Sequence, residues 1–129
     1  MQFMMTIRMD AATAFAPTPQ LMEAIGGFTK EMAAAGVLVE TGGMASSAKV
    51  TRISASGGRL SVTDGPHTET KEVVGGYAIV QVKSREEAVE IGTRFMDIHN
   101  RILGPAFTAV SEIQEMFPIP LTADQGVRA

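Results

Sequence analysis

Residues 77–91, YAIVQVKSREEAVEI, carry a strand signal and a helix signal in one uninterrupted run. Residues 77–82 are mostly apolar, which is typical of a strand that is buried in a sheet. Ser84 and Glu87 match the capping box. In this motif the first side chain accepts a hydrogen bond from the backbone N–H three residues later, and the side chain of that later residue accepts one from the backbone N–H of the first. The run therefore predicts a strand followed directly by a helix. The apolar stripe of that helix consists of Ala88, Ile91, Phe95, Ile98 and Ile102.

The chain before this run indicates another strand–helix–strand unit. Residues 2–9 have the apolar alternation of a strand. Thr18 and Pro19 are typical of a helix N-cap and of the first helical residue, and Gly36 is typical of a helix end. A second strand is expected over residues 37–43. The stripe of the first helix consists of Leu21, Ile25, Phe28, Met32 and Ala35.

A hairpin and a last strand complete the pattern. Residues 49–55 and 59–63 flank Gly57 and Gly58, and the favoured two-residue hairpin turn needs positive φ at both central positions. Glycine adopts positive φ without steric strain. Residues 107–117 alternate as the final strand.

The predicted fold class is α+β, with the ferredoxin-like order β-α-β-β-β-α-β and the middle strands elaborated as a hairpin. Two helices cover one face of an antiparallel sheet, yet apolar residues occur on both faces of the strands over residues 2–9 and 77–82. A second copy of the chain, packed sheet against sheet, is the simplest cover. The alternative is a monomer whose tail folds over the sheet. We expect one domain over residues 1–117 and a C-terminal tail over residues 118–129.

Composition narrows the function classes. The chain has 129 residues and a net charge of −3, so it offers no basic field for nucleic acid. It has no cysteine, which excludes disulfides, thiolate metal sites and a cysteine nucleophile. No stretch approaches the roughly 18 apolar residues that a membrane helix needs, and the N-terminal apolar run is too short for a signal peptide. We expect a cytoplasmic protein.

Residues 64–77, DGPHTETKEVVGGY, resemble the signature of the YCII-related superfamily, in particular its DGPF-domain branch. That branch usually has Asp-Gly-Pro-Phe, an acid, a Lys-Glu pair and then Gly-Gly-Tyr. The resemblance covers about residues 1–117. It implies a dimeric α+β barrel of two ferredoxin-like halves, with a polar cavity between sheet and helices and no firmly assigned reaction. Some members occur beside alternative sigma factors, which implies a link to transcription regulation.

The chain departs from this family pattern at two points. His67 stands where phenylalanine is usual, so a titratable ring replaces an apolar one. The wider superfamily is often described with a histidine on the first helix and an acidic partner. Residues 17–36 contain no histidine here, and a His–Asp catalytic pair is therefore not carried over.

The best candidate chemistry lies in the same polar segment. Asp64, His67, Glu69, Lys71 and Glu72 supply acids, a group that titrates near neutrality and a cation within nine residues. We predict Asp64 and His67 as catalytic residues, with Lys71 and Glu72 binding a ligand. The alternatives stay open: Asp64 caps its own backbone in a turn, and Lys71 and Glu72 form a solvated surface pair.

Three further residues are candidate ligand-binding groups. Tyr77 offers a hydroxyl to a ligand or fills a core position, and Arg8 binds a carboxylate or forms an ion pair at the rim. His99 lies beside the apolar stripe of the second helix, either at a cavity edge or as a hydrogen-bonded spectator. No compact zinc-type spacing joins the histidines to acids, so no metal is predicted.

Two functional hypotheses follow. The first is a small-molecule enzyme or binder whose cavity is lined by Asp64, His67, Tyr77 and Arg8. Any catalysis would be cofactor-independent acid–base chemistry on a small polar metabolite. The second is a non-catalytic ligand-sensing or protein-interaction module, in which the loop over residues 64–72 is a clasp that closes the dimer.

Overall fold

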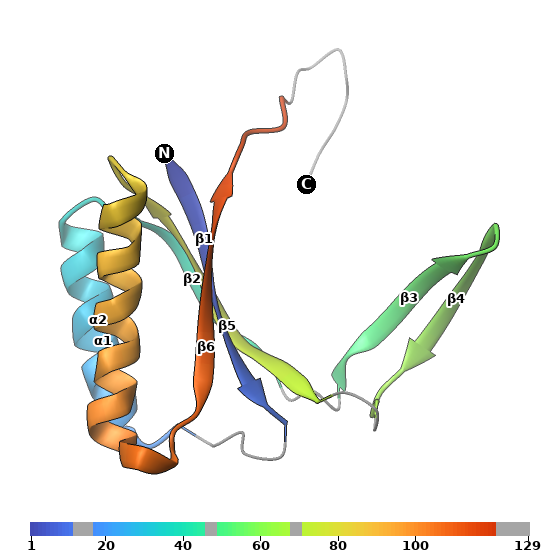
Figure 1. Cartoon of the computed structure of the whole chain (residues 1–129), viewed down its shortest axis with the longest axis horizontal. Coiled ribbons are helices and arrows are strands. Elements are labelled where there is room, and N and C mark those ends of the chain that lie inside the picture. Colours follow the sequence, from blue (N-terminus) through green and yellow to red (C-terminus); the bar gives the residue numbers. More distant parts are fainter. Residues whose placement is uncertain (12–16, 46–48, 68–70, 121–129) are drawn as a thin grey trace.

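The computed structural model describes residues 1–11, 17–45, 49–67 and 71–120. Figure 1 shows how these segments are arranged. The strands and helices, in chain order, are β1 (Gln2–Asp10), α1 (Pro19–Ala34), β2 (Leu38–Gly43), β3 (Thr51–Ser56), β4 (Arg59–Asp64), β5 (Glu72–Gln81), α2 (Arg85–Leu103), the short 3-10 helix η2 (Gly104–Ala106) and β6 (Ala109–Met116).

The main sheet has four strands in the order β2-β5-β1-β6, and its neighbouring strands run antiparallel. Both helices lie on the same face of this sheet (Figure 1). The predicted α+β class and the ferredoxin-like order are therefore confirmed, as is the hairpin between the second and third sheet strands. Within the described part of the chain, β3 and β4 pair only with each other and form a separate two-stranded sheet.

The helix starts are set by the residues that the sequence indicates. The Thr18 hydroxyl accepts a hydrogen bond from the backbone N–H of Leu21 at 3.2 Å, with Pro19 opening α1. The Ser84 hydroxyl accepts from the backbone N–H of Glu87 at 3.1 Å. Each cap satisfies an amide that has no partner inside the helix, which fixes where the helix begins.

The core lies between the main sheet and the helices. Phe3 on β1 and Val80 on β5 sit opposite each other and are almost completely buried. The two helices contribute their apolar stripes to the same space. The buried core cluster comprises Phe3, Met5, Phe28, Met32, Val80, Val82, Ala88 and Ile91.

The β3–β4 hairpin projects from the side of the sheet that is opposite the helices (Figure 1). Its turn contains Gly57 and Gly58 with φ values of 57° and 78°, as the sequence predicts. Nearly all its side chains are exposed, because it has no layer of its own chain packed against it among the described residues.

The sheet face that turns away from α1 and α2 is called the outer face here. Strand alternation places Met4 opposite Ile79 and Thr6 opposite Tyr77 on this face, while Phe3 faces the helices. No described helix covers it (Figure 1). The expectation that a second copy covers this face stays a prediction. None of the described helices is long and apolar enough to cross a membrane.

Candidate functional site

A cavity of about 550 Å³ lies between α1 and the main sheet. Its walls come from β1, α1, β2, β5, α2 and β6, and most of the lining is apolar. The polar cavity implied by the family resemblance is therefore wrong in character, although its place between sheet and helices is right. The reason is that the wall consists of the helix-facing side chains of the strands and the apolar stripe of α1. Apolar members include Met5, Ile7, Leu21, Ile25, Phe28 and Met32.

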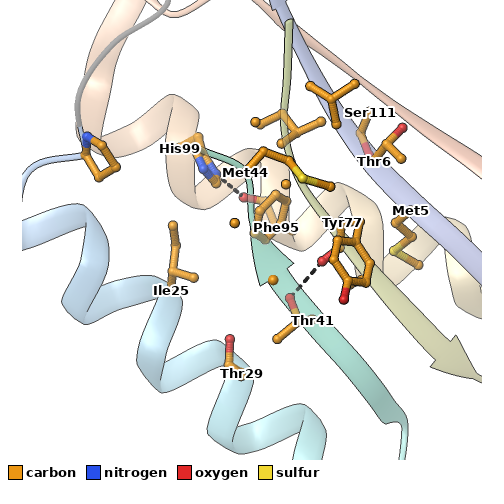
Figure 2. A pocket seen from close by; sticks show the side chains of 18 of the residues that line it. Met5, Thr6, Ile25, Thr29, Thr41, Met44, Tyr77, Phe95, His99 and Ser111 are labelled. Carbon is orange, nitrogen blue, oxygen red and sulfur yellow. Dashed lines mark hydrogen bonds between the residues drawn. The ribbon is translucent and has the colours of Figure 1, made fainter. Parts of the chain in front are cut away.

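The polar groups of this lining are few and mostly uncharged. Figure 2 shows the hydroxyls of Thr29, Thr41 and Ser111 together with His99 around the cavity. Among the described lining residues there is no aspartate, glutamate, lysine or arginine. A formally charged ligand would lose its hydration here without gaining an ionic partner.

His99 is the buried polar side chain of the cavity wall. Only 4% of it is exposed, and its Nδ1 lies 2.9 Å from the carbonyl oxygen of Phe95, one turn earlier in α2. Because a carbonyl only accepts, Nδ1 carries the hydrogen of this bond. The ring is 4.5 Å from the ring of Phe95 and stacks at 5.4 Å on that of Phe107. His99 thus reaches the cavity with its ring orientation fixed.

Tyr77 joins the cavity wall to the outer face of the sheet. Its carbonyl accepts a hydrogen bond of 2.9 Å from the Thr41 hydroxyl, and its own hydroxyl donates to the Glu40 carboxylate. This donation, followed by desolvation and the negative charge of Glu40, raises the pKa of Tyr77. A Cβ at Gly42 would lie 2.9 Å from the ring, so the ring needs glycine beside it on β2.

Asp64 and His67 lie at the base of the hairpin and outside the described cavity lining. The Asp64 carboxylate accepts from the Thr51 hydroxyl at 2.8 Å. His67 Nε2 lies 2.9 Å from the carbonyl oxygen of Val50, which also accepts from the backbone N–H of Gly65 at 2.8 Å. These bonds tie the end of β4 to the start of β3.

The remaining predicted ligand-binding residues also lie away from the cavity. Arg8 pairs with Glu112 at 2.5 Å on a half-exposed surface, which matches the alternative of a rim ion pair. Lys71 and Glu72 are exposed, and Glu72 sits opposite Asp10 at the end of the sheet. Glu69 lies outside the described residues. Of the four residues expected around one cavity, Tyr77 is among the described lining residues and Asp64, His67 and Arg8 are not.

Sequence reasoning missed the hydroxyl residues of the lining. Thr29 lies four residues after Ile25 and three before Met32, and this position at the edge of the α1 stripe was the available signal. Thr41 and Ser111 lie on the predicted strands over residues 37–43 and 107–117, and no sequence signal distinguished them from the other polar residues of those strands.

A family model of the YCII-related domain matches residues 1–95. The chain belongs to the YCII-related domain family. The matched part of this YCII-related domain runs from β1 into α2 and ends before His99. The predicted superfamily is thereby confirmed, whereas membership in the DGPF branch stays a prediction. No curated protein matches the chain.

In this YCII-related domain, an ion pair holds α1 against α2 beside the cavity. Arg94 contacts Glu31 through two nitrogens, with N–O distances of 2.8 and 3.1 Å. The guanidinium carbon also lies 4.9 Å from the centre of the Phe28 ring, which lines the cavity. The hydrogen bonds from Arg94 hold the pKa of Glu31 below its ordinary value, against a smaller opposing effect of desolvation.

Proposed function

We propose that this YCII-related domain binds a small, uncharged and largely apolar molecule in the cavity between α1 and the main sheet. The observation that carries the proposal is the lining, which is apolar apart from hydroxyls, His99 and Tyr77 in the described part of the chain. Its volume of about 550 Å³ falls within the usual range of small-molecule sites. The ligand class is thus less polar than the metabolite expected from the sequence.

His99 is the polar anchor that we assign to this ligand. It is a buried imidazole at the wall, and Phe95 and Phe107 fix its ring. A few oriented polar groups in a mostly apolar cavity supply specificity at little desolvation cost. Acid–base catalysis by Asp64 and His67 stays a prediction that these contacts do not favour, because both side chains are bonded to the start of β3.

The second candidate function is the non-catalytic interaction module. The bonds of Asp64 to Thr51 and of His67 to Val50 favour it, since they make this segment a brace for the hairpin. The partner that we propose is a second copy of the chain, packed against the outer face. The partly buried Met4 and Ile79 and the exposed Val110 on that face support this assignment.

A matched pair of probes tests the ligand class. Cyclohexanol and cyclohexanecarboxylate have the same ring, but only the second carries a charge at neutral pH. We expect cyclohexanol to raise the melting temperature of the protein more than the carboxylate does, because a ligand that binds only the folded state stabilises it. A larger shift with the carboxylate would contradict the proposal.

Two substitutions on α1 locate the binding site. Ile25→Trp fills the cavity and should remove the effect of cyclohexanol, whereas Lys30→Trp lies on the exposed side of the same helix and should preserve it. Thr29→Leu is a milder cavity-filling change if the tryptophan disturbs the fold. Equal shifts in all variants would place binding elsewhere.

A further inference from the structure

Methionine side chains are concentrated in the lining of the cavity. Met5 on β1 and Met32 on α1 lie deep in the wall, with 7% and 8% of each residue exposed. Met22 and Met44 are about half exposed and lie where the same lining meets solvent. With Met9, five of the nine methionines of the chain belong to the described lining. The cavity therefore offers flexible, polarisable thioethers from its inner wall to its opening.

Aromatic rings form a continuous part of the same lining. The ring centroids of Phe28 on α1 and Phe95 on α2 are 6.5 Å apart, with 40° between the ring planes. The ring of Phe95 is 4.5 Å from that of His99, with 58° between the planes. These tilted pairs have the geometry that the quadrupoles of aromatic rings favour. All three residues line the cavity, and Figure 2 shows Phe95 and His99 there. A further ring in the cavity would extend this cluster.

The thioethers and the rings lie close together. Met5, Phe28 and Met32 belong to one buried cluster, and Phe95 packs against it. A methionine sulfur is attracted to an aromatic ring when it lies about 5 Å away, often at the ring edge. A saturated ring lacks the quadrupole, so it gains burial and dispersion but neither of these directional contacts. This lining therefore favours an aromatic ring over a saturated ring of the same size.

The position of His99 defines what the ring carries. Because the Phe95 and His99 rings are 4.5 Å apart, a ligand ring beside Phe95 brings a short substituent within reach of the imidazole. The described lining contains no charged carboxylate, amine or guanidinium, so a charged substituent would lose its hydration without gaining an ionic partner. A hydroxyl or a carbonyl group satisfies both conditions.

We infer that the ligand of this cavity is a small aromatic compound whose ring packs among the methionines, Phe28 and Phe95 and whose uncharged polar substituent points to His99. The inference rests on the apolar binding site proposed above, and it adds the chemical class of the ligand. Methionine side chains can adjust to differently substituted rings, which widens the range of compounds within this class.

Two matched alcohols test the ligand class on the full-length protein. Benzyl alcohol and cyclohexylmethanol share a six-carbon ring and a hydroxymethyl group, and both are uncharged at neutral pH. The saturated ring has more apolar surface, so burial alone would favour cyclohexylmethanol. We expect benzyl alcohol to bind roughly two- to tenfold more tightly, the effect of a sulfur–aromatic contact. NMR titration of protein labelled with carbon-13 at the methionine methyl groups gives both dissociation constants.

The same spectra locate the ring of the ligand. An aromatic ring current shifts the resonances of nearby methyl groups, so benzyl alcohol should shift those of Met5, Met32 and Met44. The methyl groups of Met4 and Met96 are internal controls, because neither residue is in the cavity lining. Cyclohexylmethanol has no ring current and should cause smaller shifts at all five positions.

A leucine substitution removes one sulfur at nearly constant side-chain volume. Met32→Leu should reduce the preference for benzyl alcohol by about twofold or more, whereas Met96→Leu, outside the lining, should leave the preference unchanged. Met44→Leu makes the same test at a half-exposed position if the change in the core disturbs folding. An undiminished preference in both cavity variants would overturn the role assigned to sulfur.

The possible results separate the ligand class from the binding site. The absence of saturable shifts with either alcohol overturns the apolar binding site and this inference with it. Shifts confined to Met4 or Met96 place binding elsewhere and also overturn both. Saturable binding at the cavity in which cyclohexylmethanol is as tight as benzyl alcohol, or tighter, overturns the aromatic class alone.

Discussion

At the scale of single residues, Tyr77 offers a measurement that no other group disturbs. It is the only tyrosine, and the chain has no tryptophan. Its hydroxyl donates to Glu40, which raises its pKa above the ordinary value of 10. The ultraviolet absorbance of the tyrosinate should therefore show a titration midpoint above 10 in the wild type and one closer to 10 in Glu40→Ala. Glu112→Ala, which removes a carboxylate bound to Arg8, should leave the midpoint unchanged.

The hydrogen bond between Tyr77 and Glu40 also predicts how the stability of the protein changes at alkaline pH. The pKa of Tyr77 is higher in the folded state than in the unfolded state. The stability that this hydrogen bond contributes is therefore fully present below pH 10 and is lost as the pH rises through the pKa of the folded state. Glu40→Ala should lack this part of the alkaline destabilisation. Identical midpoints for the wild type and Glu40→Ala would contradict the assigned bond.

The neighbouring glycines of β5 differ in what surrounds them. A Cβ at Gly76 would lie 2.9 Å from the backbone oxygen of Gly42, and a strand backbone cannot move away cheaply. A Cβ at Gly75 would meet the terminal methyl carbon of Met9 at 2.7 Å, and that flexible side chain can turn aside. Gly76→Ala should therefore lower the free energy of unfolding by about 1–3 kcal/mol, and Gly75→Ala by less. Urea unfolding of both variants measures the difference, and equal losses would count against this reasoning.

The sequence predicted some site residues better than others. Tyr77 was expected to bind a ligand or fill a core position, and His99 to lie at a cavity edge or to be a hydrogen-bonded spectator. Both are among the described lining residues, and their part in ligand binding stays a prediction. Asp64 and His67 were grouped by their proximity in sequence, but the chain turns out of the main sheet between β2 and β5, and the two residues stay with the hairpin. Proximity along a chain does not determine which sheet a turn belongs to.

At the scale of secondary-structure elements, α1 contains a weakness that no contact requires. Gly26 and Gly27 are exposed in its middle, and a Cβ at either position meets nothing within 4 Å. Gly27→Ala should stabilise the protein by about 0.8–1 kcal/mol, the helix-propensity difference between the two residues. Gly36→Ala serves as the contrast, because φ is 74° there and alanine is strained at that angle. Thermal unfolding should move the two melting temperatures in opposite directions.

The ion pair between Glu31 on α1 and Arg94 on α2 contributes stability that is lost in acid. Arg94 holds the pKa of Glu31 below its ordinary 4.5, so the stabilisation is complete above pH 4.5 and is lost as pH falls through the lower folded value. Arg94→Met should show a smaller loss of melting temperature between neutral and acidic pH than the wild type does. Glu31→Gln should reproduce that smaller loss, and a variant as acid-sensitive as the wild type would argue against the pair.

Local signals predicted the elements themselves well. Thr18 and Ser84 marked both helix starts, and Gly57 with Gly58 marked the hairpin turn, because caps and positive φ are decided within a few residues. The separation of β3 and β4 from the main sheet left no such signal. Their alternating side chains indicate a strand with two different faces. This pattern is the same whether the strand pairs within a large sheet or with one other strand.

At the scale of the whole molecule, the order of elements and the two-helix layer followed from the sequence, and the match to the YCII-related domain agrees with them. The apolar character of the cavity did not follow from the sequence, because its wall uses the same residues that any core would use. Only the packing of α1 over β1, β2 and β5 decides that these side chains leave space instead of filling it.

The position of β1 in the sheet has a consequence for how the protein is made. Gln2 on this central strand pairs with Gln81 on one side and Met116 on the other. Both neighbours follow β1 by many residues in the chain, so β1 has both edges unpaired until β5 and β6 have been synthesised. The main sheet therefore cannot be completed before β6 is synthesised, and a chain that stops before β6 leaves one edge of β1 available for aggregation.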